Sequence, residues 1–138
     1  MILLDTNVVV DALDKAQAHH AWAKKQLEDA VVAEGGGISV VTLAELCAGA
    51  RKPEDVEPEV KRLGITVHDV PSAAAVLCGK AYRRYVTARR DSGGSAPPKM
   101  PLPDFFIGAQ AEIMGWKLAT RDQERFKRYF PKVTLVTP

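Results

Sequence analysis

Four acidic residues stand where an expected strand ends or an expected helix begins. Asp5 and Asp122 each follow a short apolar run that is typical of a buried strand. Glu45 lies about one helical turn beyond a third such run, and Asp104 falls in the first turn of an expected helix. Ligands of open parallel α/β sheets bind beyond the carboxyl ends of the strands, so these four carboxylates are expected at one edge of a sheet.

Carboxylates gathered in this way predict a site for a divalent cation. They would repel one another unless a cation neutralised them. Mg²⁺ or Mn²⁺ takes oxygen ligands and suits a site that retains several waters. Such an ion can activate water and stabilise the charge that develops on a phosphodiester during cleavage. Thr6, Asn7 and Thr120 are expected to hold waters or to orient the carboxylates.

Each of the four acids also has a purely structural explanation. Asp5 is a suitable cap for a helix that starts near Asn7, and Glu45 is the last member of the capping-box pattern Thr42-Leu43-Ala44-Glu45. Asp104 and Asp122 are favourable near helix N-termini. Their joint placement at one sheet edge, rather than any single residue, favours the catalytic interpretation.

The elements that must position these acids alternate along the chain. Strands are expected over residues 2–4, 38–41, 65–70, 117–120 and 133–136. Helices are expected over residues 8–13, 20–33, 42–50, 53–64, 71–86, 104–115 and 123–129, and a Gly-, Ser- and Pro-rich loop over 91–101. Alternation of this kind predicts an α/β fold with a mostly parallel sheet and helices on both faces.

Composition predicts one soluble domain. The chain has 138 residues, of which 46% are hydrophobic and 26% charged, which are ordinary values for a globular protein. No apolar run approaches the roughly 20 residues needed to span a bilayer, and the first residues lack the pattern of a signal peptide. We therefore expect a single domain over residues 1–138, no membrane association and a cytoplasmic location.

Cysteine and histidine do not suggest a second kind of site. Cys47 and Cys78 are far apart in apolar, helical surroundings, where they are expected to be small buried hydrophobic residues. The three histidines form no convincing zinc set. The net charge of +2 is too small to indicate nucleic-acid binding by itself, so such a function must rest on local basic patches.

In four segments the chain resembles the PIN domain, with order and spacing closest to the VapC-type toxins of bacterial toxin–antitoxin pairs. The segments are Asp5-Thr6-Asn7 after the first strand, Glu45 within Thr42 to Leu46, Pro103 to Ala111, and Ala119 to Asp122. The resemblance implies an α/β/α sandwich around a short, mostly parallel sheet. It also implies an endoribonuclease dependent on Mg²⁺ or Mn²⁺ that cleaves tRNA or rRNA and so restrains translation.

The same resemblance assigns roles and partners. It places metal binding and catalysis on Asp5, Glu45, Asp104 and Asp122, with Thr120 assisting through hydrogen bonds. It implies a homodimer and a small cognate antitoxin whose tail enters the acidic site. The sequence departs from the family in two respects: many relatives have an acid directly before Phe126, where this chain has Arg125, and the segment Asp91 to Met100 is longer and more polar than a minimal member needs.

Basic residues in two clusters are candidates for contacts with RNA phosphates. Arg89, Arg90 and Lys99 flank the long loop, whereas Arg121 and Arg125 adjoin the expected metal site. Tyr82 and Tyr85 are candidates for stacking on bases. The alternative is that these basic residues lie on solvated helix faces and that Tyr85 belongs to the core.

Other functional classes fit the sequence less well. A receiver-type signalling domain needs paired acids after the first strand and a lysine after the last, and neither is present. A haloacid-dehalogenase-like phosphatase would have a second Asp where Asn7 stands. A PIN-like scaffold that binds RNA or protein without cleavage is the remaining alternative, and the complete set of four acids argues against it.

Overall fold

The computed structural model describes residues 1–32, 35–91 and 100–138 of the chain. Its sheet has the strand order β3-β2-β1-β4-β5, and every pairing between the described strands is parallel. This confirms the expected α/β class and goes further than the mostly parallel sheet that was predicted. The strands are β1 (Ile2–Leu4), β2 (Gly37–Ser39), β3 (Thr66–His68), β4 (Lys117–Ala119) and β5 (Leu135–Val136).

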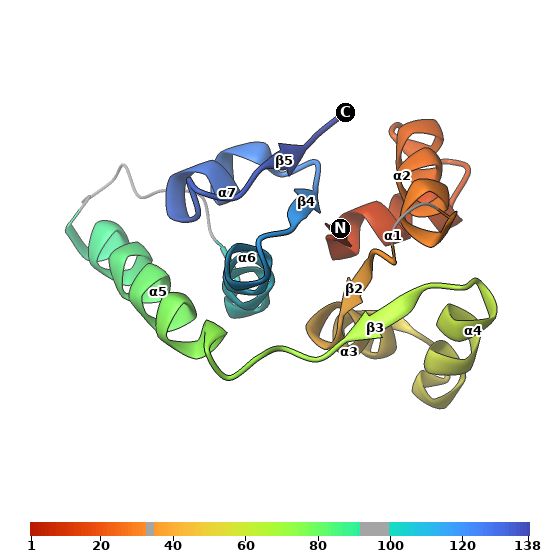
Figure 1. Cartoon of the computed structure of the whole chain (residues 1–138), viewed down its shortest axis with the longest axis horizontal. Coiled ribbons are helices and arrows are strands. Elements are labelled where there is room, and N and C mark those ends of the chain that lie inside the picture. The colour runs from red at the N-terminus through yellow and green to blue at the C-terminus, as the bar shows by residue number, and fades with distance from the viewer. Residues whose placement is uncertain (33–34, 92–99) are drawn as a thin grey trace.

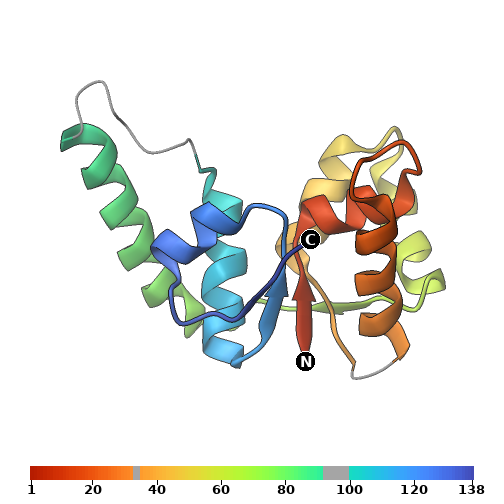
Figure 2. The same cartoon turned by 90° about the horizontal axis from the view of Figure 1, so that it is seen from above.

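Helices cover both faces of the sheet, as Figures 1 and 2 show, which confirms the three-layer arrangement. On one side lie α5, α6 and α7, and on the other α1, α2 and α4. Their bounds are α1 (Thr6–Leu13), α2 (His20–Val32), α3 (Val40–Gly49), the 3₁₀ turn η1 (Pro53–Asp55), α4 (Val56–Arg62), α5 (Ala74–Asp91), α6 (Leu102–Met114) and α7 (Gln123–Tyr129).

Two hydrophobic cores form because successive side chains of a strand point to opposite faces of the sheet. Leu3 and Leu118 pack with α5, α6 and α7. Their neighbours Leu4 and Ala119 pack on the opposite face, with α1, α2 and α4. All four side chains are fully buried. The central strands β1 and β4 are therefore held from both sides, which fixes the positions at which they end.

The boundary between β2 and α3 differs from the sequence prediction. The β-branched residues Val40 and Val41 were expected in the strand, but both are helical. The reason is Ser39, whose side chain accepts a hydrogen bond from the backbone N–H of Val41 and so caps the helix earlier. The predicted capping box at Thr42 was wrong, because Thr42 lies inside the helix and Glu45 has another partner.

Helix α6 carries Asp104 and packs closely against Phe130. It begins two residues earlier than predicted, with Pro101 as N-cap, and ends at Gly115, which adopts the left-handed conformation with φ of 65°. In its middle, Gly108 faces the ring of Phe130, and a Cβ at this position would stand 2.3 Å from a ring carbon. Helix α6 can approach Phe130 this closely only because residue 108 has no side chain.

Some other expectations need correction. Strands β3 and β5 are shorter than predicted, and α1 already begins at Thr6. Helix α5 continues to Asp91, while residues 92–99 of the predicted loop, including Lys99, lie outside the described residues. Cys78 is buried as expected, whereas Cys47 is only partly buried. None of the helices in the described ranges is long and apolar enough to cross a membrane.

Candidate active site

The sheet topology brings Asp5 and Asp122 together. Strand β1 lies between β2 and β4, and the chain leaves β1 in one direction to form β2 and β3 and later returns on the other side to form β4 and β5. The carboxyl ends of β1 and β4 therefore flank the point where the strand order reverses, which is the usual ligand position in such sheets. Asp5 directly follows β1, and Asp122 lies three residues beyond β4.

Asp5 lies at the centre of a hydrogen-bond network. Its carboxylate is 3% exposed and serves as the N-cap of α1, accepting a 2.8 Å hydrogen bond from the N–H of Thr6. Its Oδ2 accepts two more, from the hydroxyl of Thr120 at 2.8 Å and from the amide of Asn7 at 2.9 Å. The capping role foreseen from the sequence and a place in the acidic site are thus compatible.

Asn7 and Thr120 connect Asp5 to Asp122. The amide nitrogen of Asn7, which donates to Asp5, lies 3.1 Å from Oδ2 of Asp122 as well. The hydroxyl of Thr120 is fully buried and accepts a 3.0 Å hydrogen bond from the N–H of Asp122. The supporting side chains named from the sequence therefore contact the carboxylates directly.

Glu45 reaches the site from α3. Its Oε1 accepts a 2.7 Å hydrogen bond from the hydroxyl of Thr6, and that hydroxyl lies 3.2 Å from the hydroxyl of Thr42. Thr42 is fully buried, and sequence reasoning did not assign it to the site. Its position three residues before Glu45 places both on one helix face, which is the signal that identifies it.

Asp104 enters from the first turn of α6 and meets an arginine. Nη1 of Arg125 lies 3.4 Å from Oδ2 of Asp104 and 3.9 Å from Oδ2 of Asp122. The neighbouring Phe105 is fully buried and anchors this turn in the core. Thus Asn7 and Arg125 join Asp5, Asp122 and Asp104 through their side chains, and Thr6 joins Glu45 to Asp5 through its hydroxyl and its backbone N–H.

The electrostatics reflect how closely the acids gather. The pKa of Asp5 is raised to about 7, mainly by burial and to a smaller extent by the charges of Asp104 and Asp122, while hydrogen bonds from Thr120 and from the N–H of Thr6 act in the opposite direction. Burial also raises the pKa of Asp104 to about 6, with the charge of Glu45 adding to the effect and Arg125 opposing it. Both carboxylates are therefore costly to ionise in the protein alone, as expected for a site that is completed by a cation.

The donor atoms suit a hard divalent ion. Among the residues that the structure describes, no three acidic, histidine or cysteine side chains stand close enough to enclose an ion as oriented. Mg²⁺, however, keeps several waters and is commonly held through one or two carboxylates. Oxygens of Asp104 and Asp122 presently face Arg125, and a cation of higher charge at the same oxygens would relieve the repulsion that raises the pKa values.

The other arginines near the predicted RNA surface have different surroundings. Arg121 lies 3.3 Å from a carboxylate oxygen of Asp11, whose side chain is fully buried in α1. Sequence reasoning missed Asp11, although it lies four residues after Asn7 and so on the same helix face. Arg89 lies 5.7 Å from the ring centroid of Tyr85, and Arg90 is exposed near the end of α5.

The two candidate stacking residues differ in exposure. Tyr85 is 6% exposed, lies among the rings of Phe105 and Tyr129, and its hydroxyl accepts a hydrogen bond from the N–H of Met100. It belongs to the core, so the stacking hypothesis was wrong for this residue. Tyr82 is 38% exposed and packs edge-on against Phe105.

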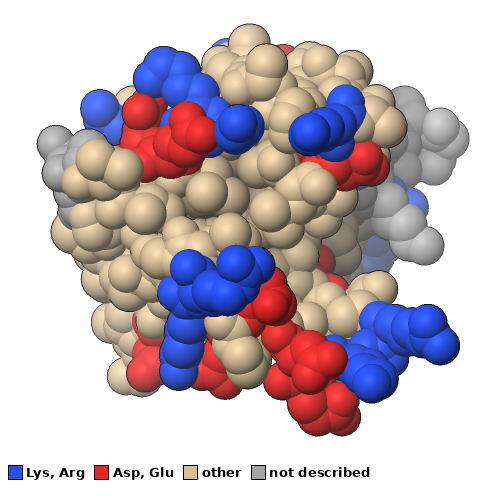
Figure 3. Space-filling view, turned by 90° about the vertical axis from the view of Figure 1, so that its right-hand side faces the viewer, with Lys and Arg blue, Asp and Glu red and all other residues tan. Residues whose placement is uncertain are grey.

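The face formed by α2 and α4 is unlike a nucleic-acid surface. In Figure 3 basic and acidic side chains lie beside one another on this side of the molecule, with uncharged surface between the groups. The pairs include Lys24 with Glu28 on α2 and Lys61 with Glu57 on α4. Mutual neutralisation leaves little net positive charge here to attract phosphates.

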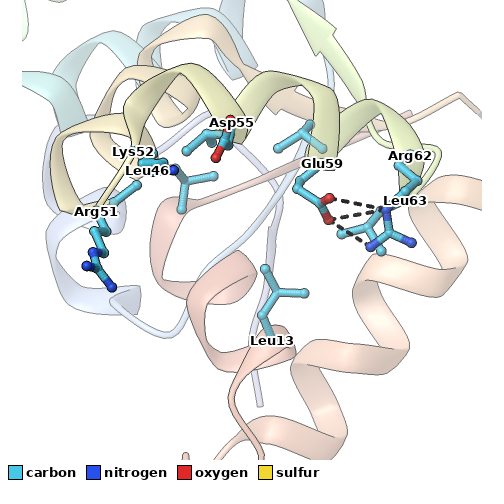
Figure 4. A pocket seen from close by; sticks show the side chains of 11 residues that line it. Leu13, Leu46, Arg51, Lys52, Asp55, Glu59, Arg62 and Leu63 are labelled. Atoms are coloured by element: carbon cyan, nitrogen blue, oxygen red, sulfur yellow. Dashed lines mark hydrogen bonds and ion pairs between the residues drawn. The ribbon is translucent and has the colours of Figure 1, made fainter.

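A separate hollow of about 610 Å³ lies between the end of α1, the end of α3 and α4. Figure 4 shows Leu13 projecting from α1 toward the side chains of α4. Leu46 and Leu63 add apolar surface, and Leu13 is 59% exposed. This groove shares α3 with the acidic site, because Leu46 directly follows Glu45.

A family model described as PIN domain matches residues 2–130 of the chain. No curated protein sequence gives a significant match. Several solved structures are similar over the whole chain, and three of them are as follows.

The first is the crystal structure of VapBC2 from Rickettsia felis bound to a DNA fragment from its promoter. One of its chains has 22% identity and a TM-score of 0.73, over 100% of this chain and 99% of that one. FitAcB from Neisseria gonorrhoeae has 26% identity and a TM-score of 0.65, over 100% and 98%. A toxin–antitoxin complex from Klebsiella pneumoniae has 24% identity and a TM-score of 0.69, over 100% and 98%. These similarities show a common fold.

Proposed function

This chain belongs to the PIN-domain family, and from that premise we propose that it is a metal-dependent endoribonuclease and the toxin of a toxin–antitoxin pair. The substrate would be a cytoplasmic RNA of the tRNA or rRNA class, whose cleavage restrains translation. One observation carries the nuclease proposal: four acids from β1, α3, α6 and the β4–α7 loop meet in one hydrogen-bonded network at the carboxyl edge of the sheet.

The metal would be Mg²⁺ or Mn²⁺, held by Asp5, Asp104 and Asp122, with Glu45 contributing directly or through water. Such an ion supplies charge neutralisation at the phosphodiester and lowers the pKa of water. The supporting roles follow from the contacts. Thr120 and Asn7 hold Oδ2 of Asp5, and Thr6 holds Oε1 of Glu45. These donors limit the rotation of the carboxylates, so that their remaining lone pairs would be available to an ion.

RNA would approach from the side of α5 and α7. Arg121 and Arg125 adjoin the acids, Arg89 and Arg90 lie at the end of α5, and Lys99 follows them in the sequence, outside the described residues. Phosphate contacts from such groups supply most of the non-specific affinity for nucleic acid. A single domain over residues 1–138 that forms a homodimer would present two such sites.

The partner would be a small antitoxin, as in the toxin–antitoxin complex that this chain resembles in fold. We propose that an apolar helix of this partner lies in the groove of Leu13, Leu46 and Leu63, since an exposed apolar surface of this kind marks an interaction site. The groove and the acidic site share α3, so a segment that leaves the groove along this helix arrives at Glu45. One partner would then cover both surfaces.

The first experiment incubates purified protein, free of antitoxin, with total cellular RNA and either Mg²⁺ or Mn²⁺. Parallel samples contain a chelator or the Asp104→Asn variant, which keeps the size of the side chain and removes its charge. Discrete fragments that disappear in both controls would support a metal-dependent ribonuclease and, once mapped, would identify its substrate. Cleavage that persists in the Asp104→Asn variant would contradict the assignment of the site.

A second experiment tests the partner surface. Leu13→Asp places a charge in the groove at an exposed position, where it should leave the fold and the cleavage activity unchanged. Co-purification with the product of a neighbouring short reading frame should be lost in this variant and kept in Val32→Asp, which is also exposed but lies outside the groove. Folded protein that binds no such product and cleaves no RNA would favour the non-catalytic scaffold instead.

A further inference from the structure

Arg125 stands between two of the proposed metal ligands. Its Nη1 is within 3.4 Å of Asp104 and 3.9 Å of Asp122, at the Oδ2 atom of each. Oδ2 of Asp122 also accepts a hydrogen bond from Asn7, whereas among the described residues Arg125 is the only partner of Oδ2 of Asp104. A guanidinium group and a metal ion would therefore compete for the same oxygens.

Arg121, four residues earlier, gives a useful contrast. Its ion-pair partner is Asp11, a residue of α1 that is not one of the four site acids. Metal binding at the four acids would leave the Arg121–Asp11 pair intact, whereas it would break the contacts of Arg125. The two arginines of this loop and helix are thus expected to respond differently to metal.

A hollow next to Arg125 could receive its guanidinium group after displacement. A hollow of about 330 Å³ lies directly beside it, lined by Arg121, Asp122, Gln123, Glu124 and Arg125. The side chain of Arg125 is 34% exposed and itself lines this hollow, so the hollow is the nearest open space for its guanidinium group. A guanidinium group binds phosphate through two parallel hydrogen bonds. Once a metal neutralised Asp122, the two arginines of the lining would outweigh Glu124 and suit this hollow to a phosphodiester of the substrate.

We propose that Arg125 couples metal binding to RNA binding. In the protein without metal it pairs with Asp104 and Asp122. When a metal takes these carboxylates, Arg125 is released and contacts a phosphate of the RNA. The metal occupies the carboxylates that compete with phosphate for Arg125, and the RNA holds the guanidinium group that competes with the metal for these carboxylates. Metal and nucleic acid therefore strengthen one another's binding by an equal factor. This inference rests on the proposed function for the identity of both ligands.

Binding measurements rather than cleavage test the coupling. The dissociation constant of Mn²⁺ is measured by calorimetry for the wild type, Arg125→Gln and Lys127→Gln. The control residue Lys127 lies on the same helix and is exposed, so its variant loses the same charge without a contact to the acids. A single-stranded DNA oligonucleotide replaces RNA as the phosphodiester probe, with its affinity measured by fluorescence anisotropy with and without Mn²⁺ and its integrity checked afterwards.

Arg125→Gln should bind Mn²⁺ about threefold more tightly than the wild type, which is the size expected for a partly exposed ion pair. The factor by which Mn²⁺ strengthens oligonucleotide binding should fall about threefold in the same variant. Lys127→Gln should match the wild type in both respects. The coupling would be overturned if Arg125→Gln bound Mn²⁺ no more tightly than the wild type, or if Mn²⁺ strengthened its oligonucleotide binding as much as that of the wild type. Either result would leave the nuclease proposal in place. A wild-type protein that binds no Mn²⁺ would overturn both.

Discussion

The contact between Gly108 and Phe130 leads to a quantitative prediction for Gly108→Ala. The new methyl group would lie 2.3 and 2.4 Å from two ring carbons, far inside van der Waals contact. Phe130 is 1% exposed and packs against Phe105 and Phe126, so its ring has little room to move. Overpacking of this kind costs up to about 3 kcal/mol, while the better helix propensity of alanine returns about 1 kcal/mol. The net loss of stability is about 2 kcal/mol.

This loss corresponds to a decrease in Tm of about 7 °C for a chain of this length, from an unfolding entropy of about 2.1 cal/mol/K per residue. Gly79→Ala is the matched control. Gly79 also lies within a helix, α5, but a Cβ there would meet nothing within 4 Å. That variant should gain up to about 1 kcal/mol from helix propensity and unfold about 3 °C higher than the wild type.

Thermal unfolding followed by circular dichroism, at one pH and with chelator present, measures both variants. If cleavage is assayed in parallel, Gly108→Ala should also lose activity below its Tm, because Asp104 lies one turn earlier on α6 and moves with it. Gly79→Ala should cleave like the wild type. A Tm of Gly108→Ala equal to or above that of the wild type would refute the close packing of α6 against Phe130.

Three further predictions concern the site. In chelator, the free energy of unfolding should fall as pH rises from about 4 to 7. The reason is that the pKa of Asp5 is raised to about 7, so the folded protein retains a proton which the unfolded chain releases. Urea titrations at several pH values should find that the free energy of unfolding of Asp5→Asn depends less on pH. Arg121→Gln should cost roughly 2 kcal/mol by leaving the carboxylate of Asp11 buried without its partner, and a loss below about 0.5 kcal/mol would contradict that pairing. Thr120→Val should lower both cleavage and stability, the latter by about 1 to 2 kcal/mol, since Asp5 and the N–H of Asp122 each lose a hydrogen bond; unfolding curves and RNA cleavage assays check both effects.

The sequence was sufficient to predict the order of the elements and the gathering of the four acids at one edge of the sheet, while their catalytic role stays a prediction. Short apolar runs such as Ile2 to Leu4 end at polar residues, and their alternation with helical segments leaves few alternatives to a parallel sheet. The acids then follow from their positions after strands or at helix starts. The gathering of these acids could be predicted because it depends on topology, and topology depends on the pattern of the whole chain.

Details that depend on competition between local interactions could not be predicted. Val40 and Val41 have strong strand preferences, yet the hydroxyl of Ser39 caps a helix that includes both. Tyr85 could be a surface or a core residue by its spacing alone, and only the packing of α5 on α6 buries it. The contact of Arg125 with two acids depends on the direction of a long side chain, for which sequence spacing gives no rule.

The link between the pattern of the strands and the chemistry of the site is the register of β1 against β4. Leu4 pairs with Ala119, so Asp5 and Thr120 are the next residues on each strand and their side chains meet at 2.8 Å. A shift of β4 by one residue would turn Leu118 and Ala119 toward the opposite faces, so that each side chain would leave the core in which it packs. The register that buries these apolar side chains is therefore also the one that joins Thr120 to Asp5. Stability of the fold and placement of the acids are thus set by the same alternation of side chains.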